Sequence, residues 1–226
     1  MRCTRRTFRR PFISLLSVLA GSCAALLQAW PASAAAPPAG WLREDLPDQG
    51  SYLLRYVPQS LDPTKPPPLI VFLHGAGGTP EYYEPYLRDA AEGAGAVLAV
   101  PKSSSSVGWG IGNDEAIVAA SRDRVAAEVA ADANRISIAG HSAGGAYAYL
   151  LAYGEASHYS AVFTLSAPYY AVPSVADPAY KAPIRMYYGT DDPNYSTGPR
   201  ASLEAQWNRL GVAFEEDVVA GYGHNV

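Results

Sequence analysis

Apolar residues gather in short runs along most of the chain, and segments with helical spacing separate these runs. Seven runs have the length of strands, and the inner ones are continuously apolar: 52–57, 69–73, 96–100, 135–139, 161–166, 184–188 and 214–219. Strands that are covered on both faces have this pattern. Helical patterns lie near residues 80–94, 113–132, 142–154 and 199–210. The alternation predicts one α/β domain over residues 51–226, with a mostly parallel sheet of about seven strands and helices on both faces.

The first 34 residues have the pattern of an export signal. An arginine-rich start precedes an apolar run from Phe12 to Leu27, and the small residues Ala32-Ser33-Ala34 follow. This order predicts cleavage after Ala34 and a mature protein without a membrane span. Residues 4–8, TRRTF, resemble the twin-arginine motif of proteins that are exported folded, with an ordinary secretory signal as the alternative. Residues 35–50, rich in proline and glycine at their start, are expected to form a linker or an extended lead-in.

Cysteine usage and charge exclude several functions for the mature chain. Cys3 and Cys23 both lie in the predicted signal, which excludes cysteine catalysis, disulfides and cysteine-ligated metals after cleavage. Cleavage also removes five arginines, leaving 12 basic against 21 acidic residues, a formal charge of about −9. Nucleic acids and anionic lipids attract basic surfaces, so neither is an expected partner. The four scattered histidines lack metal-ligand spacing, and no metal site is expected.

Residues with acid–base chemistry follow three of the predicted strands. Ser142 comes just after the strand at 135–139, Asp191 and Asp192 after 184–188, and His224 after 214–219. The carboxyl ends of parallel strands meet at one edge of a sheet, where ligands bind. A serine hydroxyl needs a neighbouring base to act as a nucleophile, and that base needs a carboxylate to orient it. The sequence therefore predicts a Ser-Asp-His site, with two candidates for the acid.

The segment GHSAG at 140–144 places Ser142 in a turn between a strand and a helix. Its glycines remove side chains where the backbone turns sharply, and the helix N-terminus favours developing negative charge beside the serine. The alternative interpretation is a plain strand–turn–helix junction. Ser142 is favoured as a nucleophile because a strand precedes it, a helix follows it, and the other two members lie at strand ends downstream.

Only one of the four histidines follows both the serine and the acid. That residue is His224, on the glycine-rich loop GYGH, and it is the predicted base. His74 is expected to order its own loop, and His141 to point away from Ser142 because consecutive side chains in the turn point apart. His158 lies in a polar turn and is interpreted as a solvated surface residue.

An acyl-transfer site also needs hydrogen-bond donors for the oxyanion. The main-chain N–H of Ala143, the residue after the serine, is one predicted donor. The second is expected from the loop HGAGG at 74–78, at Ala76 or alternatively at Gly77. A phosphate-binding role for this loop is disfavoured because it lacks the P-loop spacing and lysine.

Five motifs in this order resemble the α/β-hydrolase superfamily. They are LIVFLHGAGG (69–78), VLAVPKSSSSVGWG (97–110), RISIAGHSAGGAYAYLLA (135–152), YGTDDPN (188–194) and GYGH (221–224). The chain looks most similar to phospholipase/carboxylesterase and polyhydroxybutyrate-depolymerase-like esterases, including dienelactone-hydrolase relatives. The resemblance implies cofactor-free hydrolysis of carboxylic esters through an acyl-enzyme. It also favours Asp192 over Asp191, because the acid of the similar G-T-x-D-P loop precedes the proline.

The sequence predicts the substrate less narrowly than it predicts the type of reaction. The connection 167–183 is the sole candidate cap, and it is minimal. Tyr82, Trp109 and Tyr169 are expected to wall a shallow aromatic cleft, although with 16 tyrosines in the chain they are equally well explained as surface residues. A short cap and an open cleft favour short acyl chains or polymer ends. The alternatives are a polyhydroxyalkanoate depolymerase, a feruloyl-type esterase and, more remotely, a hydrolase-fold binding protein without turnover.

Overall fold

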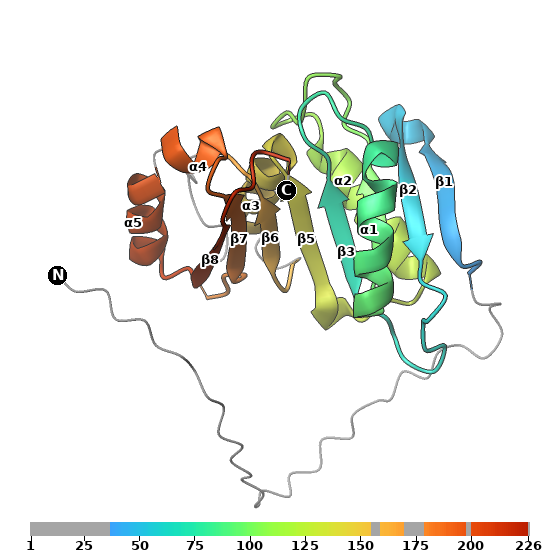
Figure 1. Cartoon of the computed structure of the whole chain (residues 1–226). Coiled ribbons are helices and arrows are strands. Elements are labelled where there is room, and N and C mark those ends of the chain that lie inside the picture. The colour runs from blue at the N-terminus through green and yellow to red at the C-terminus, as the bar shows by residue number, and fades with distance from the viewer. Residues whose placement is uncertain (1–36, 155–158, 170–178, 198–199, 226) are drawn as a thin grey trace, which may run out of the picture.

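The computed structural model describes residues 37–154, 159–169, 179–197 and 200–225 (Figure 1). The predicted export signal and most of the candidate cap lie outside the described residues. One eight-stranded sheet runs through the described chain, in the order β1-β2-β4-β3-β5-β6-β7-β8. The strands are β1 (Gly40–Leu46), β2 (Ser51–Val57), β3 (Leu69–Leu73), β4 (Val97–Pro101), β5 (Ile136–His141), β6 (Val162–Leu165), β7 (Ile184–Gly189) and β8 (Phe214–Val219).

Both β1 and β2 run antiparallel to their neighbours, and β3 to β8 pair in parallel. The helices are α1 (Pro80–Ala94), α2 (Glu115–Glu128), α3 (Ala143–Gly154), α4 (Pro193–Thr197) and α5 (Arg200–Leu210). Figure 1 shows α1 in front of the sheet and α2 and α3 behind it. The mostly parallel sheet with helices on both faces confirms the predicted fold class. Among the described helices, none is both long and apolar enough to cross a membrane.

The edge strand β1 forms where the sequence predicted a lead-in over residues 35–50. A 3-10 helix at Pro47–Gln49 and Gly50, at φ 60°, turn the chain so that β1 pairs with β2. The strand carries charged residues, which hid it in the apolar pattern. Glu44 is buried nonetheless, because its carboxylate accepts a hydrogen bond from the fully buried Arg55 at 2.8 Å. Buried charges need such a partner, and this one lies on the neighbouring strand.

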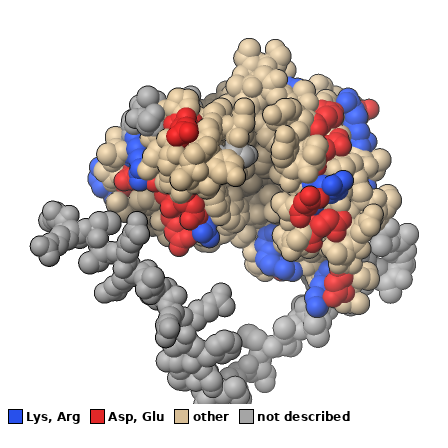
Figure 2. All heavy atoms as spheres, viewed as in Figure 1, with Lys and Arg blue, Asp and Glu red and all other residues tan. Residues whose placement is uncertain are grey.

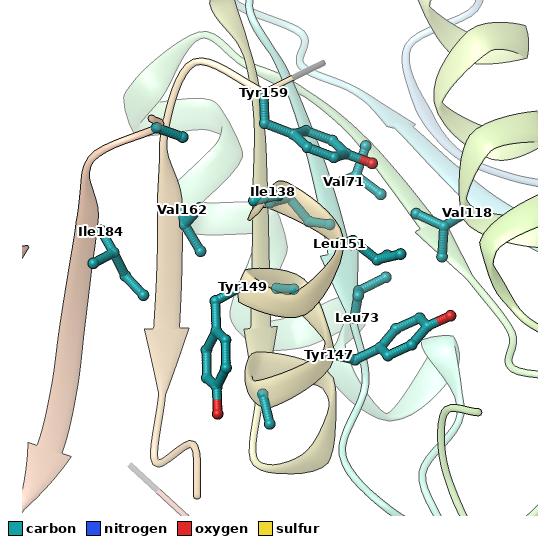
Figure 3. Packing of buried hydrophobic residues seen from close by; sticks show 14 of the residues in the cluster. Val71, Leu73, Val118, Ile138, Tyr147, Tyr149, Leu151, Tyr159, Val162 and Ile184 are labelled. Carbon is teal, nitrogen blue, oxygen red and sulfur yellow. The ribbon is translucent and has the colours of Figure 1, made fainter. Parts of the chain in front are cut away.

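The larger of two hydrophobic clusters surrounds α3 (Figure 3). Tyr147, Tyr149 and Leu151 of α3 face Val71 and Leu73 of β3, Ile138 of β5 and Val162 of β6. A helix that is apolar around most of its circumference is a buried helix. Its tyrosine hydroxyls still bond to main-chain carbonyls, as with Tyr153 to Ala182 at 3.1 Å. The smaller cluster lies under α1 on the other face of the sheet.

The N-terminus of α3 lies directly against the ends of β3 and β5. A Cβ atom on Gly144 would overlap the main-chain oxygens of Leu73 and His74. A Cβ atom on Gly145 would lie 2.8 Å from the Gly140 oxygen and 2.9 Å from the Ala167 Cβ. Glycine is therefore required where α3 begins, and this contact fixes the position of the turn that precedes it.

Replacing Gly144 by alanine tests this contact. We expect Gly144→Ala to lower the free energy of unfolding by about 3 kcal/mol or more, because the backbone on both sides must shift to admit a methyl group. The matched control is Gly154→Ala on the same helix, where a Cβ atom meets nothing within 4 Å. That variant should change stability by less than about 1 kcal/mol. Chemical denaturation measures both, and equal effects would contradict the close approach.

Candidate active site

Ser142 occupies the single-residue turn between β5 and α3. Its φ angle is 52°, in the left-handed region that residues with a side chain rarely adopt. Neighbouring elements hold this conformation: the Ser142 N–H donates to the Leu165 oxygen at 2.8 Å, and the Ala146 N–H donates to the Ser142 oxygen at 3.1 Å. Strained backbone that is held in this way is typical of functional sites.

His224 lies between Ser142 and a buried carboxylate. Its Nε2 is 2.9 Å from the Ser142 Oγ, and its Nδ1 is 3.1 Å from the Asp192 Oδ1. A carboxylate accepts hydrogen bonds, so Nδ1 carries the proton and Nε2 is left to accept the serine proton. The Asp192 side chain is 0% exposed, whereas Asp191 is exposed and bonds to the Thr190 hydroxyl at 3.1 Å. The structure thus brings Asp192, and not Asp191, to the histidine.

Direct contact between two loops positions the acid and the histidine. A Cβ atom on Gly189 would overlap the Tyr222 main-chain oxygen, and that oxygen also accepts the Asp191 N–H at 2.9 Å. Asn194, which sequence reasoning missed, donates its main-chain N–H to Asp192 Oδ1 at 2.8 Å and its side-chain amide to the Ser166 oxygen at 2.8 Å. Its place two residues after the acid in the D-P-N segment is the one signal that the sequence offers.

His74 orders the loop that follows β3. The side chain is fully buried; its Nδ1 donates to the Gly75 oxygen at 2.8 Å, and its Nε2 accepts from the Ser103 N–H at 3.2 Å. The His74 main-chain oxygen accepts from Trp109 Nε1 at 2.7 Å. Burial lowers the pKa of His74 to about 4, which keeps the ring neutral in this network. The loop at 74–78 is thereby joined to the loop that carries Trp109.

Ala76 and Ala143 both lie close to Gly108, and Ala76 lines the same cleft as Ser142. A Cβ atom on Gly108 would lie 3.8 Å from the Ala76 Cβ and 3.9 Å from the Ala143 Cβ. Ala143 is the first residue of α3, where main-chain N–H groups have no partner within the helix. The Ala76 N–H likewise forms no hydrogen bond within the described chain. Two residues with an unpaired main-chain N–H therefore lie close to the serine.

One hollow is lined by Ser142 and a second by the next residue, Ala143. A cleft of about 280 Å³ is lined by Ser142, His224, His141, Tyr82, Tyr83 and Asn225 together with residues 75–78, and no Asp, Glu, Lys or Arg side chain lines it. A groove of about 710 Å³ is lined by Ala143 and by apolar and aromatic residues that include Val107, Trp109, Ile111, Tyr147 and Leu150, together with the polar residues Ser104, Ser105, Asn113 and Asp114. Figure 2 shows charged side chains on the two flanks of the molecule and an uncharged hollow between them.

The three predicted substrate-binding residues have different positions. Tyr82 is 56% exposed and lines the cleft, and Trp109 lines the groove, where its ring stacks on Tyr147 at 5.7 Å. The prediction for Tyr169 is wrong, because this residue is 2% exposed. Its ring stacks on Tyr188 at 5.3 Å, and its hydroxyl donates to Glu216 at 2.9 Å. The partners that bury Tyr169 come from β7 and β8, so the local sequence gives no sign of them.

The structure also gives His141 a set of contacts that the sequence does not indicate. Its side chain lies between the Tyr83 hydroxyl and the His224 main chain, and it lines the same cleft as Ser142. Tyr83 is 58 residues away in sequence, so no local sequence pattern predicts the contact. Among the described residues, no group of three His, Cys, Asp or Glu side chains could hold a metal ion.

This fold and this site define a hydrolase of the α/β class. The chain belongs to the alpha/beta hydrolase family, whose profile matches residues 70–225. A crystal structure of S-formylglutathione hydrolase from Staphylococcus aureus is similar, with a TM-score of 0.63 and 16% identity over 85% of this chain and 93% of that one. The poly(3-hydroxybutyrate) depolymerase of Bordetella parapertussis gives a TM-score of 0.64 and 19% identity over 83% and 85% of the two chains.

A structure titled ferulic acid esterase gives a TM-score of 0.62 and 14% identity over 82% of this chain and 91% of that one. At these identities the likeness shows the fold alone. No curated protein matches the sequence.

The buried imidazole of His74 makes stability depend on pH. Its pKa of about 4 in the folded protein lies below the ordinary value of 6.5. The unfolded chain therefore binds more protons between these two pH values, and stability falls as pH drops through that window. We expect this group to remove about 3 kcal/mol between pH 6.5 and pH 4. In NMR, one imidazole should titrate near pH 4 and be missing from His74→Gln, whose unfolding should also lose this part of the pH dependence. A His74 titration near pH 6.5 would contradict the burial.

Proposed function

We propose that the protein is a serine hydrolase that cleaves carboxylic esters, with Ser142 as nucleophile, His224 as base and Asp192 as the orienting acid. One observation carries the proposal. A fully buried carboxylate, an imidazole and a serine at positive φ form a continuous hydrogen-bonded chain, with separations of 3.1 and 2.9 Å. A structural junction alone does not require these three groups to be aligned in this order.

The reaction proceeds in two halves. In the first, the Ser142 Oγ attacks the ester carbonyl carbon while His224 Nε2 takes the hydroxyl proton. The carbonyl π electrons move onto oxygen, and the N–H groups of Ala143 and Ala76 bind that oxyanion. When the intermediate collapses, the C–O bond to the alcohol breaks and His224 returns the proton to the alcohol. In the second half a water molecule repeats these steps, releasing the acid and restoring Ser142.

Asp192 acts through His224. Its buried carboxylate holds the proton on Nδ1 and stabilises the imidazolium that forms when Nε2 takes the serine proton. The main-chain N–H of Asn194 fixes the carboxylate oxygen that faces the ring. Since this oxygen is bound on two sides, the imidazole has one favoured orientation, with Nε2 toward Ser142.

The size and polarity of the cleft favour a short, uncharged acyl group. A volume of about 280 Å³ is just below the usual range for small-molecule sites, and no Asp, Glu, Lys or Arg side chain lines the cleft. The overall negative charge of the mature sequence argues in the same direction, against anionic polymers such as nucleic acids.

A second candidate substrate class is an aromatic or polymeric ester. The groove past Ala143 favours it, because Trp109 and Tyr147 form an apolar wall and Val107 and Ile111 are more than two-thirds exposed. Such a groove would accept the ring of a feruloyl ester or the next unit of a polyester chain. The names of two structurally similar proteins, a polyester depolymerase and a ferulic acid esterase, are consistent with this candidate.

Substitutions of Ser142 and Asp192 test the mechanism, and a substitution of the neighbouring Asp191 is the matched control. We expect Ser142→Ala to lower kcat for p-nitrophenyl acetate by a factor of about 10⁴ or more, and Asp192→Asn by about 10³ to 10⁴. Asp191→Asn, an exposed substitution one residue away, should alter kcat by less than about twofold. Equal losses in the two Asp variants would reject the assignment of Asp192.

The same assay, run from acetate to palmitate esters and on methyl ferulate and poly(3-hydroxybutyrate), separates the substrate classes. A maximum at short chains supports the small cleft, and a preference for ferulate or polymer supports the groove. If the parent and Ser142→Ala both lack turnover, a hydrolase-fold binding protein becomes the better description.

We further propose that the protein is exported through the twin-arginine route. Support comes from the residues TRRTF at 4–8, the apolar run and the A-x-A sequence before residue 35. The conservative change Arg5→Lys with Arg6→Lys keeps the charge but removes the paired guanidinium groups, and we expect it to leave the precursor inside the cell. Cell fractionation in a host with this pathway measures the effect. The matched control is Arg9→Lys with Arg10→Lys, which should be exported; export of both variants would indicate an ordinary secretory signal.

A further inference from the structure

The His141 ring bridges two loops of the site. Its Nδ1 is 2.8 Å from the Tyr83 hydroxyl, and its Nε2 is 2.9 Å from the main-chain oxygen of His224. The Tyr83 hydroxyl in turn accepts the Gly75 N–H at 3.0 Å. A continuous path of hydrogen bonds therefore runs from the loop after β3, through the side chain of α1 and that of β5, to the loop after β8.

Donor and acceptor rules give this path one direction. The His224 oxygen only accepts, so His141 Nε2 carries a proton, and in the neutral ring Nδ1 is then an acceptor. Tyr83 therefore donates its hydroxyl proton to Nδ1 and accepts the Gly75 N–H with a lone pair. Every group on the path has a partner of the right kind. Burial lowers the pKa of His141 and raises that of Tyr83, which is consistent with both groups being neutral.

The fit around the path is close. A Cβ atom on Gly75 would lie 3.0 Å from His141 Nδ1, 3.1 Å from the Tyr83 hydroxyl and 3.5 Å from the Ser142 Cβ. Tyr83 is 9% exposed, and its ring packs on Phe72 at 5.0 Å. The two side chains are thus held by packing as well as by hydrogen bonds, next to the serine.

His141 makes the one hydrogen bond that the His224 main chain forms within the described chain. The rest of the loop after β8 is held on its other side, where Gly221 N–H donates to the Thr190 hydroxyl at 2.9 Å and Tyr222 contacts Gly189. Without His141, the backbone that carries the base would be tied only to the loop that carries the acid. Among the described residues, the His224 main chain would then have no hydrogen bond to the strand that ends beside Ser142.

We propose that Tyr83 and His141 form a positioning pair that ties the loop carrying the oxyanion donor to the backbone of the base. This inference rests on the proposed function, since it assigns the pair a role in the geometry of that reaction. The pair sets where His224 lies relative to Ser142, and where residues 75–78 lie relative to both. Because neither side chain takes part in the chemical step, its loss acts on alignment, and a displacement of about 1 Å costs up to about 10²-fold in rate.

Four variants test the pair. His141→Leu removes both hydrogen bonds and should lower kcat for p-nitrophenyl acetate by about 10- to 100-fold, with KM changed by less than about threefold. His141→Gln keeps a donor near the Nε2 position and should recover most of the loss. Tyr83→Phe keeps the packing on Phe72 but removes the hydroxyl, and should lower kcat in the same way. The matched control is Tyr153→Phe, which also loses one buried hydroxyl hydrogen bond, to Ala182, and should keep the parental kcat.

Nitrogen-15 NMR of the imidazoles gives a readout that is independent of turnover. In the parent, His141 should show an acceptor-type Nδ1 and a protonated Nε2, assigned by their absence from His141→Gln. In Tyr83→Phe the Nδ1 signal should move, because its donor is gone. An unchanged signal, or a His141 tautomer with the proton on Nδ1, would overturn the proposed hydrogen-bond path.

The outcomes separate this inference from the proposed function. If the parent hydrolyses esters and Ser142→Ala does not, but His141→Leu and Tyr83→Phe retain the parental kcat, the positioning role is wrong and the esterase assignment stands. If His141→Leu fails to fold, the comparison of kcat between Tyr83→Phe and the control Tyr153→Phe decides whether the pair has a positioning role. If the parent hydrolyses no ester, the proposed function fails, and the NMR comparison alone decides whether the two loops are joined.

Discussion

The contact between the first turn of α3 and the ends of β3 and β5 is the constraint on which the rest of the site depends. At Gly144 the helix backbone approaches the Leu73 and His74 carbonyls more closely than any side chain permits. This approach holds the turn at Ser142 in its left-handed conformation and sets the loop after β3 beside it. The nucleophile and both candidate oxyanion donors therefore share one rigid backbone unit. The acid and the base come from separate loops and have to be aligned with it.

Buried hydrogen bonds supply that alignment. Asp192, His74 and the hydroxyl of Tyr83 are all buried or nearly so, and each has a partner that fixes which atom carries a proton. An unpaired polar group in such surroundings is costly, so each of these hydrogen bonds favours one orientation of its side chain. Asp192 is bound through Oδ1 alone, because its Oδ2 has no partner among the described residues. Three histidines lie within this region, and each has a distinct environment. His74 orders a loop, His141 spans two loops, and His224 faces the serine.

Sequence patterns were sufficient for features whose cause is local or periodic. Continuous apolar runs predicted seven strands, and the positions just after them predicted that Ser142, an acid and His224 would meet at one edge. Features whose cause lies on another element were missed. Glu44 makes β1 look like a polar lead-in until Arg55 of β2 is known to pair with it, and Tyr169 is buried by residues of β7 and β8. The contact between Tyr83 and His141 joins residues that share no local pattern.

The two faces of the sheet hold hydrophobic clusters of unequal size, and the site draws on both. Ser142 immediately precedes α3, a helix of the larger cluster, whereas Tyr83 belongs to α1, over the smaller one. The helix α1 therefore packs against the smaller cluster. It also contains Pro85, which has no N–H to donate to the preceding turn, so one hydrogen bond of the helix is missing. Local opening free energies follow such differences in packing. Warming would therefore loosen α1 before the central sheet melts, and a protein that is still folded by most measures would already have lost one side of its site.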